Sequence, residues 1–200
     1  MSPPNGPARP ESTRDRLFEA AVATFAVQGF HGTTTRDIAA AAGMSPAAIY
    51  VHHRSKEEIL YRIARRGHEN TLALVRAARA SSEDPVEQLR AVVRDFAAHH
   101  ARGNTTARVV NYELAALDEP HLAEILELRR AIDGEVQDLV RGGVAAGVFD
   151  CRDPRIAAAA LLSLGIDIAR WYQEPGHWTP EELGEAYADI AVRVVGARTA

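Results

Sequence analysis

TTTRDIAAAAGMSPAAIYVHHRSK, residues 33–56, decides the fold of this chain, because it predicts two short helices joined by a tight turn. Thr34 or Thr35 can cap a first helix whose apolar residues recur at helical spacing. Gly43 supplies the left-handed conformation that the turn requires. Ser45 then caps a second helix that has proline in its first turn, where a missing N–H costs nothing. This arrangement is typical of a helix-turn-helix motif that reads DNA.

The second helix carries small side chains at its start, so it can lie deep in a major groove. Contacts at the starts of the two helices would set sequence preference, whereas phosphate contacts would set register and affinity. The residues predicted to contact double-stranded DNA are Thr34, Thr35, Arg36, Ser45, Pro46 and Ala47, with Tyr50, His52 and Lys56 as phosphate contacts.

The run TTTRDIAAAAGMSPAAIYVHHRSKEEIL, residues 33–60, resembles the N-terminal domain of the TetR family of bacterial transcriptional regulators. The likeness extends back through RDRLFEAAVATFAVQGFHG, residues 14–32. Two residues depart from the family pattern, since His53 and Arg54 stand where a Phe and then a Pro are usual. A pocket that normally buries a phenyl ring therefore holds an imidazole, which needs a hydrogen-bond partner or weakens the packing.

The chain after residue 56 has helical periodicity and little strand signal, so we predict an all-α fold of about nine helices. Proline and capping residues mark the helix starts. The later helices are expected at residues 56–80, 84–102, 104–118, 121–146, 153–173 and 179–195. The predicted division is a disordered arm at 1–11, a helix-turn-helix domain at 12–56 and, as the resemblance implies, a ligand-binding and dimerisation domain at 57–200.

The charge distribution agrees with a DNA-binding N-terminal region. Residues 9–66 hold nine cationic side chains against six anionic ones, which gives +3, although the whole chain carries −4. Lys56 is the only lysine in the sequence, so its place in the motif is more informative than that of any arginine. No apolar run is long enough to span a bilayer and the N-terminus lacks a signal peptide pattern, so we expect a cytoplasmic protein without a membrane partner.

The last two predicted helices are amphipathic and carry small residues. Their apolar faces either complete the core of one subunit or, as the resemblance implies, build a homodimer interface. A two-fold dimer would place two reading helices on a palindromic operator, at half-sites about 34 Å apart. The predicted faces comprise Ala157, Ala160, Leu161, Leu164 and Ile168 on one helix, and Leu183, Ala186, Tyr187, Ile190, Ala191 and Val194 on the other.

The resemblance also implies a pocket for a small-molecule effector among the middle helices. The C-terminal half is loosely similar to a TetR subgroup that senses acyl-CoA thioesters. Arg129, Arg130 and Arg170 could bind the phosphates of such a ligand, although a single arginine is more often a surface charge. The predicted lining residues are Phe96, His99, His100, Val109, Tyr112, Glu113, Leu126, Arg129, Arg130, Ile132, Ile166, Arg170, Trp171 and Tyr172.

Enzymatic and metal-binding functions find little support in the sequence. No phosphate-binding glycine loop, nucleophile elbow or metal-ligand spacing is present, so we expect no catalytic residue, metal or cofactor. The predicted function is a ligand-responsive transcriptional regulator, more specifically a repressor released by a hydrophobic or acyl-CoA-type effector. The alternative is an all-α ligand-binding or interaction module with a degenerate DNA reader, which the His53-Arg54 departure would favour.

Overall fold

The computed structural model describes residues 13–173 and 175–197, apart from the side chain of His52. The predicted arm at residues 1–11 lies outside this range. In the described residues the fold is all-α, as predicted, with nine α-helices, one short 3-10 helix and no strand. The helices are α1 (Thr13–Gly32), α2 (Thr35–Ala41), α3 (Pro46–His52), α4 (Lys56–Arg79), α5 (Pro85–Arg102), α6 (Asn104–Tyr112), the 3-10 helix η1 (Leu114–Ala116), α7 (Glu119–Ala145), α8 (Pro154–Trp171) and α9 (Pro180–Val194).

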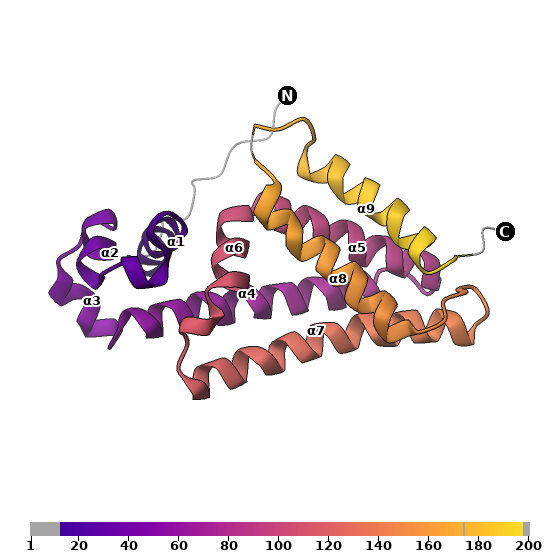
Figure 1. The fold of residues 1–200 in the computed structure, drawn as a ribbon, viewed down its shortest axis with the longest axis horizontal. Coiled ribbons are helices and arrows are strands. Elements are labelled where there is room, and N and C mark those ends of the chain that lie inside the picture. The colour runs from indigo at the N-terminus through magenta and orange to yellow at the C-terminus, as the bar shows by residue number, and fades with distance from the viewer. Residues whose placement is uncertain (1–12, 174, 198–200) are drawn as a thin grey trace, which may run out of the picture.

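The helices form a small head at one end of a larger body (Figure 1). The head consists of α1, α2 and α3, and the long helix α4 leads from it into the body. Helix α7 runs beside α4, while α5 and α9 pack on each other. The short helix α6 crosses between the head and the body and contacts α1, α4 and α8. It is therefore placed to connect the two parts.

Local capping explains where the body helices begin. Asp84 and Asp153 each accept a hydrogen bond from a backbone N–H two residues on, and a proline follows each of them. Thr179 forms a reciprocal capping box with Glu182, again with proline next in the chain. Side-chain caps and proline at the first helical position are sequence-local signals, and the helix starts predicted from them are confirmed.

The apolar core continues from the head into the body. Phe25, Ile38 and Ile49 are fully buried in the head, and they belong to one cluster with Val109 of α6 and Ile125 of α7. A second cluster fills the body between α4, α5, α7, α8 and α9. Because burial of each large apolar side chain contributes about 1.5–3 kcal/mol, the shared cluster resists separation of head from body.

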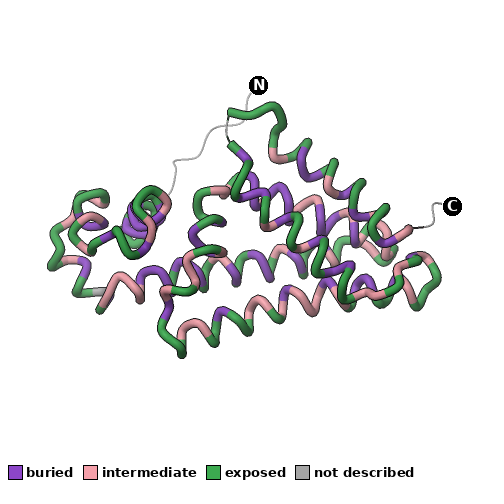
Figure 2. Tube along the Cα trace, in the orientation of Figure 1, coloured by how far each residue is buried: buried purple, intermediate pink, exposed green. Residues whose placement is uncertain are grey.

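The structure divides the predicted apolar faces of α8 and α9 between core and surface. Ala157, Leu161, Ile168, Leu183 and Ala191 are buried within the subunit, so for these residues the first alternative, completion of the core of one subunit, holds. Helix α8 is apolar over most of its circumference, and periodicity alone therefore could not select the inner stripe. The exposed apolar residues of α8 and α9 are Ile156, Ala159, Ala160, Leu164, Trp171, Ala186, Ile190 and Val194. Figure 2 shows exposed stretches along both helices.

Candidate DNA-binding surface and effector cavity

Helix α2 begins with a reciprocal capping box. The Thr34 Oγ1 accepts a hydrogen bond from Asp37 N at 3.2 Å, and the Asp37 carboxylate accepts one from Thr34 N at 2.8 Å. The side-chain hydrogen bond from the Thr34 hydroxyl lowers the pKa of Asp37. The start of α2 is thus held by two side chains, which fixes the position of Thr35 and Arg36 in its first turn.

The turn between α2 and α3 follows the predicted chemistry. Gly43 has φ 65°, and no atom lies within 4 Å of where its Cβ would be, so backbone conformation rather than space requires glycine here. Ser45 caps α3, accepting a hydrogen bond from Ala48 N at 3.2 Å. Pro46 occupies the first position of the helix. The motif predicted from residues 33–56 is therefore present in the structure.

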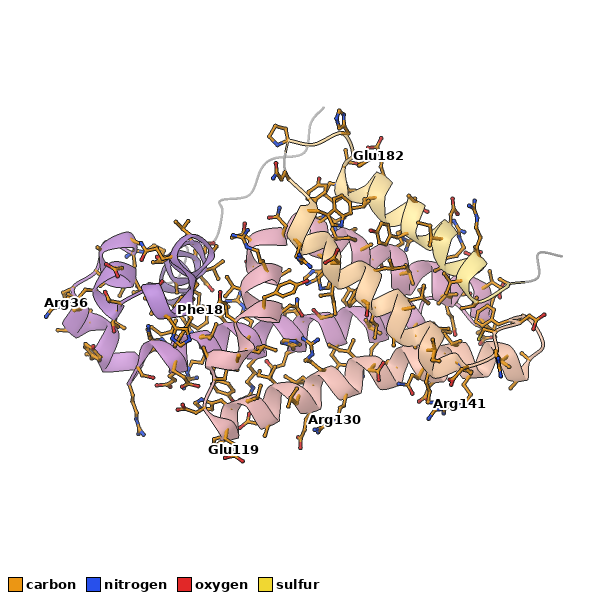
Figure 3. The ribbon with its side chains drawn as sticks, in the orientation of Figure 1. Phe18, Arg36, Glu119, Arg130, Arg141 and Glu182 are labelled. Atoms are coloured by element: carbon orange, nitrogen blue, oxygen red, sulfur yellow. The ribbon has the colours of Figure 1, made fainter. Side chains whose placement is uncertain are left out.

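The predicted contact residues of α2 and α3 form one solvent-facing surface. Arg36, Ser45, Pro46 and Ala47 are exposed, and Figure 3 shows Arg36 at the outer tip of the head, away from the body. The exposed Tyr50 donates a hydrogen bond from its hydroxyl to Thr35 Oγ1 at 3.3 Å, which joins α3 to α2. The side chain of His52 lies outside the described part of the chain.

One exposed apolar residue of α3 was not predicted as a DNA contact. Val51 is 75% exposed, although valine is usually buried. It lies on the same short helix as the exposed Tyr50 and the fully buried Ile49. A β-branched side chain can contact the methyl group of thymine, so Val51 is a further candidate for contact with DNA. Its spacing was a usable signal, because residues two apart, such as Ile49 and Val51, face different sides of a helix.

Lys56 contacts the protein backbone. Its Nζ donates hydrogen bonds to Phe30 O and Thr33 O, each at 2.7 Å, and lies 4.3 Å from the centre of the Phe30 ring. These carbonyls belong to the junction between α1 and α2. Two of the three ammonium donors are therefore used within the head, and the predicted phosphate contact stays a prediction.

His53 fills the position at which the family usually has phenylalanine. It is buried, and its ring lies 5.9 Å from that of Phe18 at an angle of 50°. The next residue, Arg54, is exposed, and its backbone N–H donates to Glu58 Oε2 at 2.8 Å. The imidazole thus packs as an aromatic ring, and α3 keeps its connection to α4.

A cavity of about 340 Å³ lies between α4, α5, α6, α7 and α8. This size is within the range of small-molecule sites. The structure brings half of the predicted lining residues to it, namely Phe96, His100, Leu126, Arg129, Arg130, Ile132 and Ile166. The lining residues that sequence reasoning missed are His68, Thr71, Val110, Asn111, Asp133, Ala159, Leu162 and Ser163.

The remaining predicted lining residues lie elsewhere. Val109, Tyr112, Glu113 and Arg170 line a separate cavity of about 230 Å³ beside α1. Trp171 is exposed on α8. Tyr172 and His99 line neither cavity. Tyr172 is buried, and its hydroxyl donates a hydrogen bond to Trp178 O, whereas His99 lies on α5. The sequence pattern did not separate the two sides of α6.

The cavity of about 340 Å³, the larger of these two and called the larger cavity hereafter, is lined by both neutral and charged polar groups. Burial lowers the pKa of His68 and lowers that of His100 to about 4, so both imidazoles are neutral near pH 7. Their Nδ1 atoms lie 2.8 Å from Ala64 O and 2.9 Å from Phe96 O, respectively. Arg129 donates from Nη1 to Asn111 Oδ1 at 3.1 Å, which links α7 to α6 at the cavity wall.

Three polar residues form a latch between the starts of α4 and α7. The Glu57 Oε1 accepts from Asp118 N at 3.1 Å and lies 2.8 Å from His121 Nδ1. His121 also stacks on Tyr61 with a ring separation of 3.8 Å. Ligand atoms of Glu57, Asp118 and His121 lie within 4.8 Å of one another, as a metal ion would require. Glu57 Oε1 already contacts both Asp118 N and His121 Nδ1. These contacts therefore also account for the cluster as a structural connection between α4 and α7.

In the described part of the chain, none of the helices combines the length and apolar character needed to cross a membrane. A helix-turn-helix head on an all-α body is the architecture of a DNA-binding protein of the helix-turn-helix class. The profile described as bacterial regulatory proteins, tetR family, matches residues 17–63, and the profile described as Tetracyclin repressor-like, C-terminal domain, matches residues 82–195. The second match alone covers more than half of the chain, which therefore belongs to the TetR family.

Individual relatives agree with this assignment. The HTH-type transcriptional repressor KstR2 of Mycolicibacterium smegmatis is 28% identical over 193 residues, which cover 94% of this chain and 93% of that protein. A tetR family regulatory protein from Rhodococcus RHA1 is 36% identical, with a TM-score of 0.87 over 94% of this chain and 99% of that one. The structure of AibR in complex with isovaleryl coenzyme A and operator DNA shares the fold at 23% identity, with a TM-score of 0.82 over 94% of this chain and 100% of that one.

Proposed function

We propose that this chain is a dimeric, cytoplasmic repressor that leaves its operator when a hydrophobic effector of the acyl-CoA type enters the larger cavity. The observation that carries the proposal is that one short helix, α6, contacts both the cavity and the head. Asn111 of α6 accepts a hydrogen bond from Arg129 in the cavity wall. Arg108 of the same helix donates to Ala26 O of α1 at 2.9 Å. A displacement of α6 would therefore reach both sites.

Contacts in the head continue this connection toward α3, the predicted DNA-recognition helix. Glu113, at the end of α6, accepts a hydrogen bond from Phe30 N of α1 at 3.4 Å. The carbonyl of Phe30 in turn accepts from Lys56, at the start of α4. Three residues separate the end of α3 from the start of α4. A shift of α1 against α4 would therefore tilt α3 in the major groove of the bound DNA. An effector changes this equilibrium only through different affinities for the two shapes.

The outward face of α8 and α9 supports the proposed dimer. Exposed apolar side chains recur along both helices, and Ile156 is 68% exposed. An exposed apolar patch marks an interaction site, and both helices contribute several exposed apolar side chains. A second copy paired on the same face would give a closed two-fold dimer, which matches a palindromic operator.

The cavity lining supports an amphipathic effector with an anionic end. Apolar side chains such as Phe96, Ile132 and Ile166 suit an acyl group. Arg129 and the exposed Arg130 could bind carboxylate or phosphate, and Figure 3 shows Arg130 on the outer side of α7. AibR, which binds isovaleryl coenzyme A, resembles this chain in fold only, so the effector class rests on these side chains.

The proposal is tested by fluorescence anisotropy on labelled DNA from upstream of the gene, with and without a panel of acyl-CoA thioesters at fixed salt. We expect tight binding that at least one thioester reverses, while free coenzyme A does not. Binding that no thioester relieves would refute the effector class and retain the repressor. Absence of binding would favour the alternative, an all-α interaction module with a degenerate reader.

A further inference from the structure

The cavity contains a buried hydrogen-bond acceptor that no described residue satisfies. His68 is 4% exposed and lines the cavity from α4, and its Nε2 has no hydrogen-bond partner within the described residues. Leaving a buried polar atom unsatisfied destabilises the folded protein. A ligand that supplied the missing partner would recover this free energy on binding.

The geometry of the ring identifies Nε2 as an acceptor. Nδ1 of His68 lies 2.8 Å from Ala64 O, and a carbonyl can only accept, so Nδ1 carries the proton. Burial and the nearby charge of Arg129 lower the pKa of His68, so the ring is neutral near pH 7. In a neutral imidazole with Nδ1 protonated, Nε2 holds a lone pair and no hydrogen. The bond to its own helix also turns Nε2 away from the α4 backbone.

Two other polar groups of the lining are already engaged. The Thr71 hydroxyl donates to Gly67 O at 2.9 Å, and the Asn111 amide donates to Ala107 O at 2.8 Å. His100 repeats the arrangement of His68, since its Nδ1 lies 2.9 Å from Phe96 O, and its Nε2 is thus an acceptor as well. The Nε2 atoms of both histidines are therefore acceptors, and an acceptor can be matched only by a donor.

We propose that the effector carries a hydroxyl group on its apolar part, which donates a hydrogen bond to Nε2 of His68. The proposal rests on the proposed function, because it specifies the ligand of the same cavity. It selects an alcohol over an alkane, ether or ketone of the same skeleton, since only the alcohol has a hydrogen to donate. The anionic end of the ligand would lie toward Arg129 and Arg130.

Matched sets of alkanoic acids test this choice. For each chain length of about six to twelve carbons, which suits a cavity of a few hundred Å³, the set holds the plain acid, its ω-hydroxy form and its ω-methoxy form. Calorimetry on the free protein measures the affinity of each acid. At the chain length that places the oxygen beside His68, we expect the ω-hydroxy acid to bind about tenfold tighter than the plain acid and the ω-methoxy acid. If no hydroxy acid binds tighter than its partners at any length, the proposal is wrong.

Variants of the lining separate a specific hydrogen bond from a general effect of polarity. His68→Phe should abolish the preference for the hydroxyl, and His68→Gln should restore part of it through the amide oxygen. His177→Phe, at an exposed histidine outside the cavity, should leave the preference unchanged. A preference that persists in a folded His68→Phe protein would overturn the assignment. DNA release is measured separately, so a hydroxy acid that binds tightly without releasing DNA would refute the proposed function while upholding the hydroxyl.

Discussion

Gly67 of α4 lies directly against Val110 of α6. A Cβ placed on Gly67 would come within 3.0 Å of Val110 Cγ2 and 3.1 Å of its Cγ1. Val110 also lines the larger cavity, so the close approach of the two helices sets one wall of it. The absence of a side chain at residue 67 thus determines how α6 sits between the cavity and the head.

We predict that Gly67→Ala destabilises the protein and weakens DNA binding, because α6 must move away from α4. Overpacking costs typically about 1–3 kcal/mol, against about 1 kcal/mol gained from better helix propensity. Gly134→Ala in α7 is the matched control, since nothing lies within 4 Å of its Cβ position. Urea unfolding should show a gain of stability in the control alone, and equal gains in both variants would contradict the packing argument.

Lys56→Met should lower the unfolding free energy by about 2–3 kcal/mol, because it removes charged hydrogen bonds to Phe30 O and Thr33 O. It should also weaken binding to all DNA sequences alike, since the junction of α1 and α2 loses its anchor. Arg54→Met, at an exposed cation two residues away, should leave stability unchanged. Unaltered stability of Lys56→Met, with a salt dependence reduced by about one phosphate contact, would instead assign Lys56 to the DNA.

Arg36→Ala should reduce the preference for operator over unrelated DNA, because Arg36 is exposed at the tip of the head. Loss of one base-edge contact costs about 1–3 kcal/mol of discrimination. Tyr50→Phe is a suitable comparison, since it removes only the hydroxyl that bonds to Thr35. Anisotropy on both DNAs at one salt concentration measures the ratio. An equal loss of affinity for both DNAs would place Arg36 on phosphate.

Stability should fall in acid because of His100. Its pKa is about 4 in the folded protein, mainly through burial, whereas an unfolded histidine titrates near 6.5. Between these values the unfolded chain binds a proton that the folded one does not, so stability is lost as the pH falls from about 6.5 to about 4, by roughly 3 kcal/mol.

Unfolding of His100→Leu as a function of pH checks this expectation. The other titratable or charged groups of this region are His68, His99 and Arg129, and the variant leaves all three unchanged. The acid loss should be smaller than in wild type, whereas the exposed His177→Gln should keep the full loss. Identical acid limbs in wild type and His100→Leu would contradict the assignment to His100.

Leu164→Glu and Ile190→Glu should convert the dimer to a monomer, because each places a charge on the outward apolar face of α8 or α9. Light scattering after size exclusion measures the mass. Val27→Glu, at an exposed apolar residue of α1, is the control that should stay dimeric. A dimer that survives both changes would remove these helices from the interface.

Local chemistry was readable from the sequence, while packing between distant residues was not. The Asp84-Pro85 and Thr179-Pro180 pairs act within one helical turn, so the helix starts could be predicted. His68 was missed, although it stands four residues after the buried Ala64 on the apolar side of α4. The two carbonyls bound by Lys56 lie 23 and 26 residues earlier in the chain, and no periodicity reports such a contact.

The cavity and the DNA surface are proposed to be coupled, and such a coupling must be reciprocal. The measurement is the affinity of the releasing acyl-CoA for the protein alone and for the protein saturated with operator DNA. Linkage requires that the operator weaken effector binding by the same factor by which the effector weakens operator binding. We predict equal factors of about 5 to 150. The same effector affinity with and without operator would show that the cavity and the DNA surface are not coupled.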